Sequence, residues 1–115
     1  MSVFQQGGIY LARLDPAKGA EIGKLRPVVV LTNQQLLDEE PVLIFVCPLS
    51  TQSQPEFSAL HVLIEARERL LKKSYALVEH CRSLSARRIQ NDQLATLSRT
   101  QLHAVIHRLE RMIEP

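Results

Sequence analysis

The chain has 115 residues and a mass of 13.0 kDa, a length typical of one domain with a single core. Hydrophobic residues make up 45% of it, which excludes a disordered or fibrous protein, and no run of about 20 apolar residues could span a membrane. Residues 1–8 lack the basic and apolar regions of a signal peptide. We therefore expect a cytoplasmic protein with no membrane association.

The formal net charge of +2 is too small to indicate nucleic-acid binding by itself, but the charge is unevenly distributed. Residues 1–57 hold four basic and six acidic side chains, whereas residues 58–115 hold ten basic and six acidic ones. Two interpretations stay open: the second half faces a polyanion, or it is an ordinary solvated surface. Cys47 and Cys81 are too few and too widely spaced for a disulfide framework or a zinc site, so we expect reduced structural thiols.

Turn-forming residues dominate the first half of the chain, because all four glycines and five of the six prolines lie within residues 1–55. The β-branched and alternating apolar runs predict strands over residues 9–14, 26–32, 42–46, 60–64 and 75–84, the last as one or two short strands. Loops are expected at 17–25, 33–41, 49–57 and 65–73. Five or six short strands without crossover helices indicate a mainly β fold, a small closed or half-closed barrel.

Near the C-terminus the spacing of the apolar residues changes from the pattern of a strand to that of a helix. Ser98 and Gln101 have the spacing of a capping box, which predicts that a helix begins here and extends over about residues 99–114. Its apolar residues recur at spacings of three and four: Leu102, Val105, Ile106, Leu109, Met112 and Ile113. This stripe must pack on the barrel or on another subunit. We expect one domain over residues 1–115, with the barrel at about 8–97.

Most motifs of enzyme chemistry are missing from the sequence. His103 and His107 are four residues apart, but no glutamate base lies between them and no third ligand is near, so neither a metal nor a cofactor is expected. Two loops remain, each beside a buried strand. One carries Glu21 and Arg26, and the other begins at Ser50. A carboxylate, a cation and a hydroxyl could converge there on a phosphodiester, or these are a surface ion pair and an ordinary turn.

Several segments follow one another in a characteristic order: residues 8–16, 18–21, 26–30, 47–53, 74–78 and 82–84, and then the capped C-terminal helix. Together they resemble the MazF/PemK family of toxins from bacterial toxin–antitoxin modules. The resemblance implies an SH3-like β-barrel with a C-terminal α-helix, acting as a homodimer. It also implies a metal-independent, sequence-specific endoribonuclease that cuts single-stranded RNA and is held inactive by a cognate antitoxin. Binding to DNA is then expected only of the toxin–antitoxin complex.

The resemblance also assigns residues. Arg26 matches the family's catalytic arginine, Ser50 takes the place of its catalytic threonine, and Glu21 matches an acidic residue implicated in some members. Glu21 is either the base for the 2′-hydroxyl of the RNA or the group that orients Arg26. The implied substrate-binding residues are Lys18, Gly19, Thr51, Gln52, Ser53, Glu79, His80 and Arg82. Of these, His80 stands where many relatives carry glutamine, so it either alters the base preference or is a strand residue at a dimer seam.

Two alternatives stay open from the sequence. The same barrel type occurs in the CcdB family, which poisons DNA gyrase by contact and cleaves nothing. Alternatively, the chain is an inactive module that binds RNA or antitoxin, because serine at position 50 lacks the methyl group that limits the rotamers of threonine.

Overall fold

The structure, a computed structural model, describes residues 3–14, 25–53 and 55–115. Its strands are β1 (Gly8–Arg13), β2 (Leu25–Val30), β3 (Leu43–Ser50), β4 (His61–Ile64), β5 (Ser74–Leu77), β6 (Arg82–Ser85) and β7 (Ala95–Thr96). Two α-helices, α1 (Gln34–Asp38) and α2 (Arg99–Ile113), and three 3₁₀-helices, η1 (Pro55–Leu60), η2 (Val78–His80) and η3 (Ala86–Arg88), complete the described elements. All of the predicted strands are confirmed, and the segment expected at 75–84 is two strands separated by η2.

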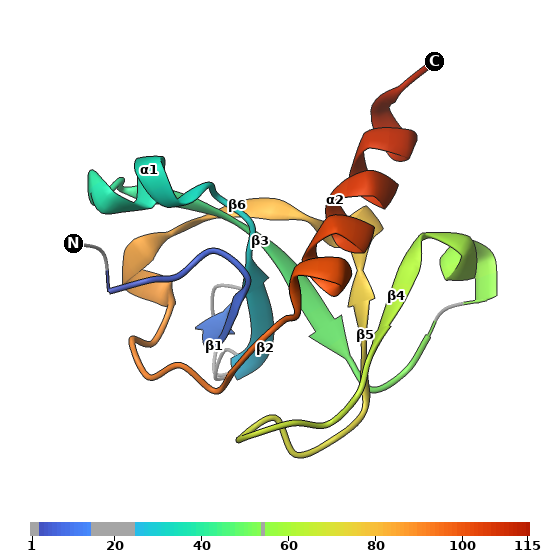
Figure 1. The fold of residues 1–115 in the computed structure, drawn as a ribbon, viewed down its shortest axis with the longest axis horizontal. Helices are drawn as coiled ribbons and strands as arrows, with labels where there is room; N and C mark the ends of the chain where they lie inside the picture. Colours follow the sequence, from blue (N-terminus) through green and yellow to red (C-terminus); the bar gives the residue numbers. More distant parts are fainter. Residues whose placement is uncertain (1–2, 15–24, 54) are drawn as a thin grey trace, which may run out of the picture.

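The seven strands form one curled antiparallel sheet in the order β4–β5–β3–β2–β1–β7, with β6 pairing with β3 beside this path. Figure 1 shows the sheet curling around itself, with α2 lying over it. The fold is therefore a half-barrel with a C-terminal helix, as the strand pattern predicted. The short β7, which pairs with Gly8 and Ile9 of β1, was not predicted, since two residues show no periodicity.

The central strand is β3, which continues beyond its predicted end at Val46 to Ser50. On one edge it pairs with β2, and on the other its first half pairs with β6 and its last two residues with β5. Pro48 lies where the neighbour changes from β6, whose last pair is Val46 with Arg82, to β5. A proline is tolerated there because no ladder bond is required from its nitrogen.

Alternating residues of the strands pack into two clusters on opposite faces of the sheet. One cluster includes Tyr10, Val28 and Val46, and the other includes Ile9, Val29 and Cys47, all fully buried. The second cluster lies under α2, whose Val105 belongs to it. The first cluster continues at one end into the cleft described below.

One element differs from the polar connector expected at residues 33–41. The Asn33 side chain accepts a hydrogen bond from the Leu36 amide at 2.9 Å and caps the short helix α1. Leu37 is fully buried in the cluster that contains Tyr10. The Asn33 cap and the buried Leu37 stabilise this single turn, although most of the other residues in the segment are polar.

The C-terminal helix begins as predicted, because Ser98 and Gln101 form a complete capping box. Val105 is buried and Leu102 and Leu109 are half-buried against the sheet, whereas Met112 and Ile113 are exposed. The stripe therefore packs on the half-barrel only along its first part. In the described part of the chain, neither helix has the length and apolar content needed to traverse a bilayer.

Candidate active site

Arg26 and Ser50 come from adjacent strands and line the same cleft. The antiparallel β2–β3 ladder ends with the pair of Val28 and Pro48, and Arg26 and Ser50 each lie two residues beyond that pair. Side chains two residues apart on a strand project from the same face, so the guanidinium and the hydroxyl are on the face of Val28 and Pro48. The sequence alone left open whether these two segments meet, and their shared cleft shows that they do.

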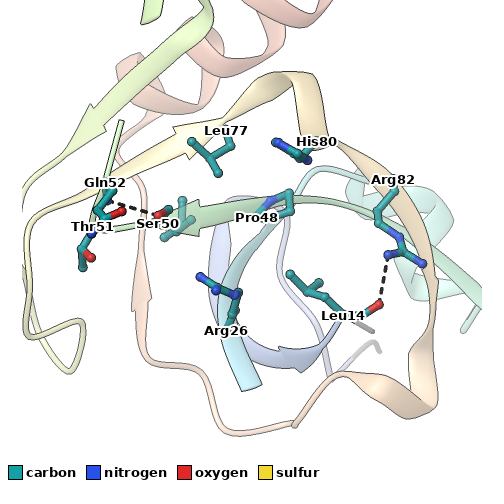
Figure 2. Close-up of a pocket in the computed structure, with 10 residues that line it drawn as sticks. Leu14, Arg26, Pro48, Ser50, Thr51, Gln52, Leu77, His80 and Arg82 are labelled. Atoms are coloured by element: carbon teal, nitrogen blue, oxygen red, sulfur yellow. Dashed lines mark hydrogen bonds between the residues drawn. The ribbon is translucent and has the colours of Figure 1, made fainter. Parts of the chain in front are cut away.

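These two residues line an open cleft of about 600 Å³ at the end of β3. Its other lining residues are Leu14, Pro48, Leu49, Thr51, Gln52, Leu77, His80 and Arg82. Figure 2 shows Arg26 and Leu14 on one side of Pro48, and Leu77 and His80 on the other. A chain laid across the cleft would therefore contact β2, the loop after β3 and η2 together.

A local turn orients the Ser50 hydroxyl. Its Oγ accepts a hydrogen bond from the backbone N–H of Gln52 at 3.1 Å, which is the usual behaviour of serine at a turn. A hydroxyl that accepts one bond still has its proton to donate. Ser50 can therefore act as a hydrogen-bond donor to an oxygen in the cleft.

The cleft is positively charged among the described residues. Arg26 and Arg82 contribute positive charge to its lining from β2 and β6, no acidic residue lines it, and none of the described carboxylates forms an ion pair with Arg26. Arg82 donates to the Leu14 carbonyl at 3.0 Å, which holds its side chain along the wall. Such a surface suits a polyanionic ligand.

Some expected site residues are not in this lining. Lys18, Gly19 and Glu21 lie outside the described residues. Ser53 and Glu79 are next to the cleft, but their side chains are hydrogen-bonded to His61. The residues brought together are thus Arg26, Ser50, Thr51, Gln52, His80 and Arg82.

The family is identified by a model that matches residues 5–113, almost the whole chain, and is described as a PemK-like, MazF-like toxin of type II toxin–antitoxin systems. The chain belongs to this toxin family. The resemblance inferred from the sequence motifs is thereby confirmed.

Individual relatives agree with this assignment. The toxin is 31% identical over 109 residues to Endoribonuclease MazF of Staphylococcus epidermidis, covering 94% of this chain and 89% of the relative. It superimposes with a TM-score of 0.78 on a Deinococcus radiodurans MazE–MazF structure, at 25% identity and covering 98% and 97% of the two chains. The Mycobacterium tuberculosis toxin MazF-mt6 shares the fold, with a TM-score of 0.73, 21% identity and coverage of 90% and 93%.

Sequence reasoning missed part of the toxin's site. Leu14 and Leu77 line the cleft but come from strand ends with no polar signal. The pairing of β4 with β5, which places His61 beside Leu77, is the feature that could not be foreseen. Among the described residues, no group of three or more histidine, cysteine or acidic side chains could hold a metal ion.

Two thiols meet behind the cleft floor. The β3–β6 ladder ends with the pair of Val46 and Arg82, and Cys47 and Cys81 are the next residues on the two segments. A side-chain hydrogen bond with Cys81, together with burial, raises the pKa of the Cys47 thiol well above its ordinary value. Both cysteines are free, and Cys47 is fully buried.

Proposed function

We propose that this toxin cleaves single-stranded RNA at specific sequences without a metal, by promoting attack of the RNA's own 2′-hydroxyl on the adjacent phosphorus. The products are a 2′,3′-cyclic phosphate and a 5′-hydroxyl end. The observation that carries the proposal is the placement of Arg26 and Ser50 in the lining of one open, basic cleft. Endoribonuclease activity itself rests on family membership and on the nearly full-length similarity to Endoribonuclease MazF.

The reaction requires charge stabilisation, alignment and proton transfer, but no protein nucleophile. The Arg26 guanidinium can bind two non-bridging phosphate oxygens through its planar fork as negative charge develops on them. Arginine holds its proton too firmly to serve as the acid, so its role is electrostatic. Ser50 donates its hydroxyl proton in a hydrogen bond to the phosphate or to the leaving oxygen.

Glu21 is the proposed partner of Arg26. Its carboxylate either accepts the proton of the 2′-hydroxyl or orients the guanidinium. A Glu21→Gln variant separates these roles, because a base is lost with the charge whereas an amide still accepts a hydrogen bond from Arg26.

Base recognition is proposed for the residues around the two catalytic ones. Sequence-specific RNA recognition mainly targets unpaired bases, whose edges a duplex conceals. The proposed contacts are Lys18, Gly19, Thr51, Gln52, Ser53, Glu79, His80 and Arg82. Thr51, Gln52 and His80 are exposed beside the cleft and can hydrogen-bond to base edges. The chain has three phenylalanines, two tyrosines and no tryptophan, so hydrogen bonding rather than a wide stacking platform carries the specificity.

The partners that we propose for this toxin are those of its family: a cognate antitoxin and a second copy of the toxin. Structures of MazE–MazF complexes from Deinococcus radiodurans are among the most similar ones, and we propose that a cognate antitoxin covers the cleft of this toxin and competes with RNA for Arg26. The toxin acts as a two-fold dimer in the cytoplasm, and DNA is bound only by the toxin–antitoxin complex. RNA cleavage that persists at full rate in excess antitoxin would contradict this competition.

The function is tested with purified toxin, a long single-stranded RNA and EDTA, followed by mapping of the new ends. We expect cuts at a recurring short sequence with 5′-hydroxyl ends, and a loss of at least about a hundredfold in Arg26→Ala. Arg111→Ala is the matched control, because this exposed arginine lies on the last turn of α2, outside the cleft. If no protein cuts, the enzyme proposal is wrong, and a gyrase-binding or RNA-binding toxin becomes the better account.

A further inference from the structure

A buried histidine behind the cleft connects two of its walls. The His61 side chain is only 2% exposed, and both of its ring nitrogens are hydrogen-bonded. Nδ1 lies 2.8 Å from the Ser53 Oγ, and Nε2 lies 2.7 and 3.0 Å from the two carboxylate oxygens of Glu79. The cleft mechanism uses none of these contacts.

The two partners of His61 belong to opposite parts of the cleft. Ser53 is in the loop that begins with Ser50 and supplies Thr51 and Gln52 to the lining, whereas Glu79 is in η2, next to His80. The Glu79 Oε2 that accepts from His61 also lies 3.9 Å from the His80 Nε2. One chain of polar contacts therefore runs from the loop after β3 to a residue on the opposite wall.

His61 itself is firmly held. It pairs with Leu77 at one end of the β4–β5 ladder, and its backbone carbonyl accepts a hydrogen bond from the Arg108 guanidinium of α2. Both ring nitrogens are engaged, and with the proton on Nε2 the ring donates to Glu79 while the Ser53 hydroxyl donates to Nδ1.

Serine, histidine and glutamate in one hydrogen-bonded chain also resemble a hydrolase triad, but the order of the nitrogens is reversed. In such a triad the serine faces Nε2 and the carboxylate faces Nδ1, whereas here Ser53 is on Nδ1 and Glu79 is on Nε2. The arrangement therefore favours a structural link over a nucleophile.

We propose that His61 is a positioning residue, which sets the spacing between the loop of residues 50–53 and η2 and thereby the seating of RNA in the cleft. The expected effect on RNA cleavage rests on the proposed ribonuclease function. The expected effect on the spacing between the loop of residues 50–53 and η2 does not. A catalytic or binding group displaced by about 1 Å can lower the rate by up to a hundredfold. Loss of the contacts of His61 with Ser53 and Glu79 would therefore weaken RNA binding in the cleft.

Two variants each remove the hydrogen bond between Ser53 and His61. Ser53→Ala removes the hydroxyl, and His61→Gln keeps an amide that can donate to Glu79 while losing the contact to Ser53. We expect each to reduce kcat/KM about tenfold, mainly through a higher KM, and to leave the unfolding transition intact. The kcat/KM of the double variant is expected to equal that of the less active single variant, because both changes break the same contact between Ser53 and His61. His107→Gln, an exposed histidine of α2, is the matched control and keeps full activity.

A readout independent of catalysis completes the test. Hydrogen–deuterium exchange of peptides covering residues 50–53 is expected to speed up about tenfold in Ser53→Ala and His61→Gln, and to stay unchanged in His107→Gln. Unchanged exchange in both variants, or kinetic losses that multiply in the double variant, would overturn the positioning role. Absence of RNA cleavage by the unaltered toxin would overturn the proposed function alone, and the exchange experiment would still decide the role of His61.

Discussion

Cys47 of β3 lies against Cys81, where the β3–β6 ladder would continue beyond the pair of Val46 and Arg82. The sequence predicts reduced structural thiols at both positions and contains no signal that they meet. Their contact lies directly before Pro48 and Ser50 in the chain, on the face of the sheet that α2 covers.

The thiol pair predicts how Cys47 reacts. The hydrogen bond with Cys81 and burial raise the pKa of the Cys47 thiol, so little thiolate is present at neutral pH and alkylation of native protein should be slow. In Cys81→Ala, that pKa returns toward its ordinary value, and the pH profile of Cys47 alkylation should move to lower pH. Iodoacetamide labelling followed by mass spectrometry measures the profile, with Cys47→Ser as the blank. Identical profiles in the two proteins would contradict the contact.

Tyr10 should make stability depend on alkaline pH. Its hydroxyl accepts from the Gln5 amide at 2.8 Å and donates to Gln93 Oε1 at 3.1 Å, and burial raises its pKa. Since the native state holds this proton more tightly, the stabilisation is complete below the ordinary phenol range and is lost as pH rises through the folded-state value.

The Tyr10→Phe variant tests this. It should lose about 1–2 kcal/mol of unfolding free energy at neutral pH, because the Gln5 amide loses its acceptor, and its stability should decline less steeply between pH 9 and 11. Urea unfolding at several pH values measures both effects. Parallel pH curves for the two proteins would show that the phenol is not the titrating group.

Ser50 offers a direct comparison with the threonine of the family. In Ser50→Ala we expect the cleavage rate to fall about a hundredfold, because the donor to the phosphate or leaving oxygen is gone. Ser50→Thr keeps the hydroxyl and adds a methyl group that restricts its rotamers, so the rate should equal or exceed that of the natural protein. Single-turnover cleavage of a short RNA measures the chemical step. A Ser50→Ala protein with an unchanged rate would remove Ser50 from the mechanism.

The capping box of α2 should contribute measurably to stability. Ser98→Ala removes the side-chain acceptor for the Gln101 amide, and we expect a loss of about 1 kcal/mol of unfolding free energy. Thr100→Ala is a suitable control, since it changes an exposed neighbour in the same turn without touching the box. Equal denaturation midpoints for the Ser98→Ala and natural proteins would contradict the contribution of the cap.

Much of this molecule could be predicted from local sequence patterns. The β-branched run around Val28–Val30 forms a buried strand, and Ser98 caps the last helix, because side-chain period and capping chemistry act over a few neighbouring residues. The resemblance to the toxin family also singled out Arg26 and Ser50 as candidates, because the motifs that contain them follow the family's order along the chain.

Tertiary structure alone decided which distant residues meet. The β2–β3 pairing brings Arg26 and Ser50 into one cleft, the β3–β6 pairing ends beside Cys47 and Cys81, and the positions of β4 and η2 enclose His61 between Ser53 and Glu79. The helical turn at α1 depended likewise on the burial of Leu37 in a core assembled from other strands. Register is determined by packing between segments far apart in sequence, which no local pattern contains, so the cleft and the contacts behind it appear only in the folded chain.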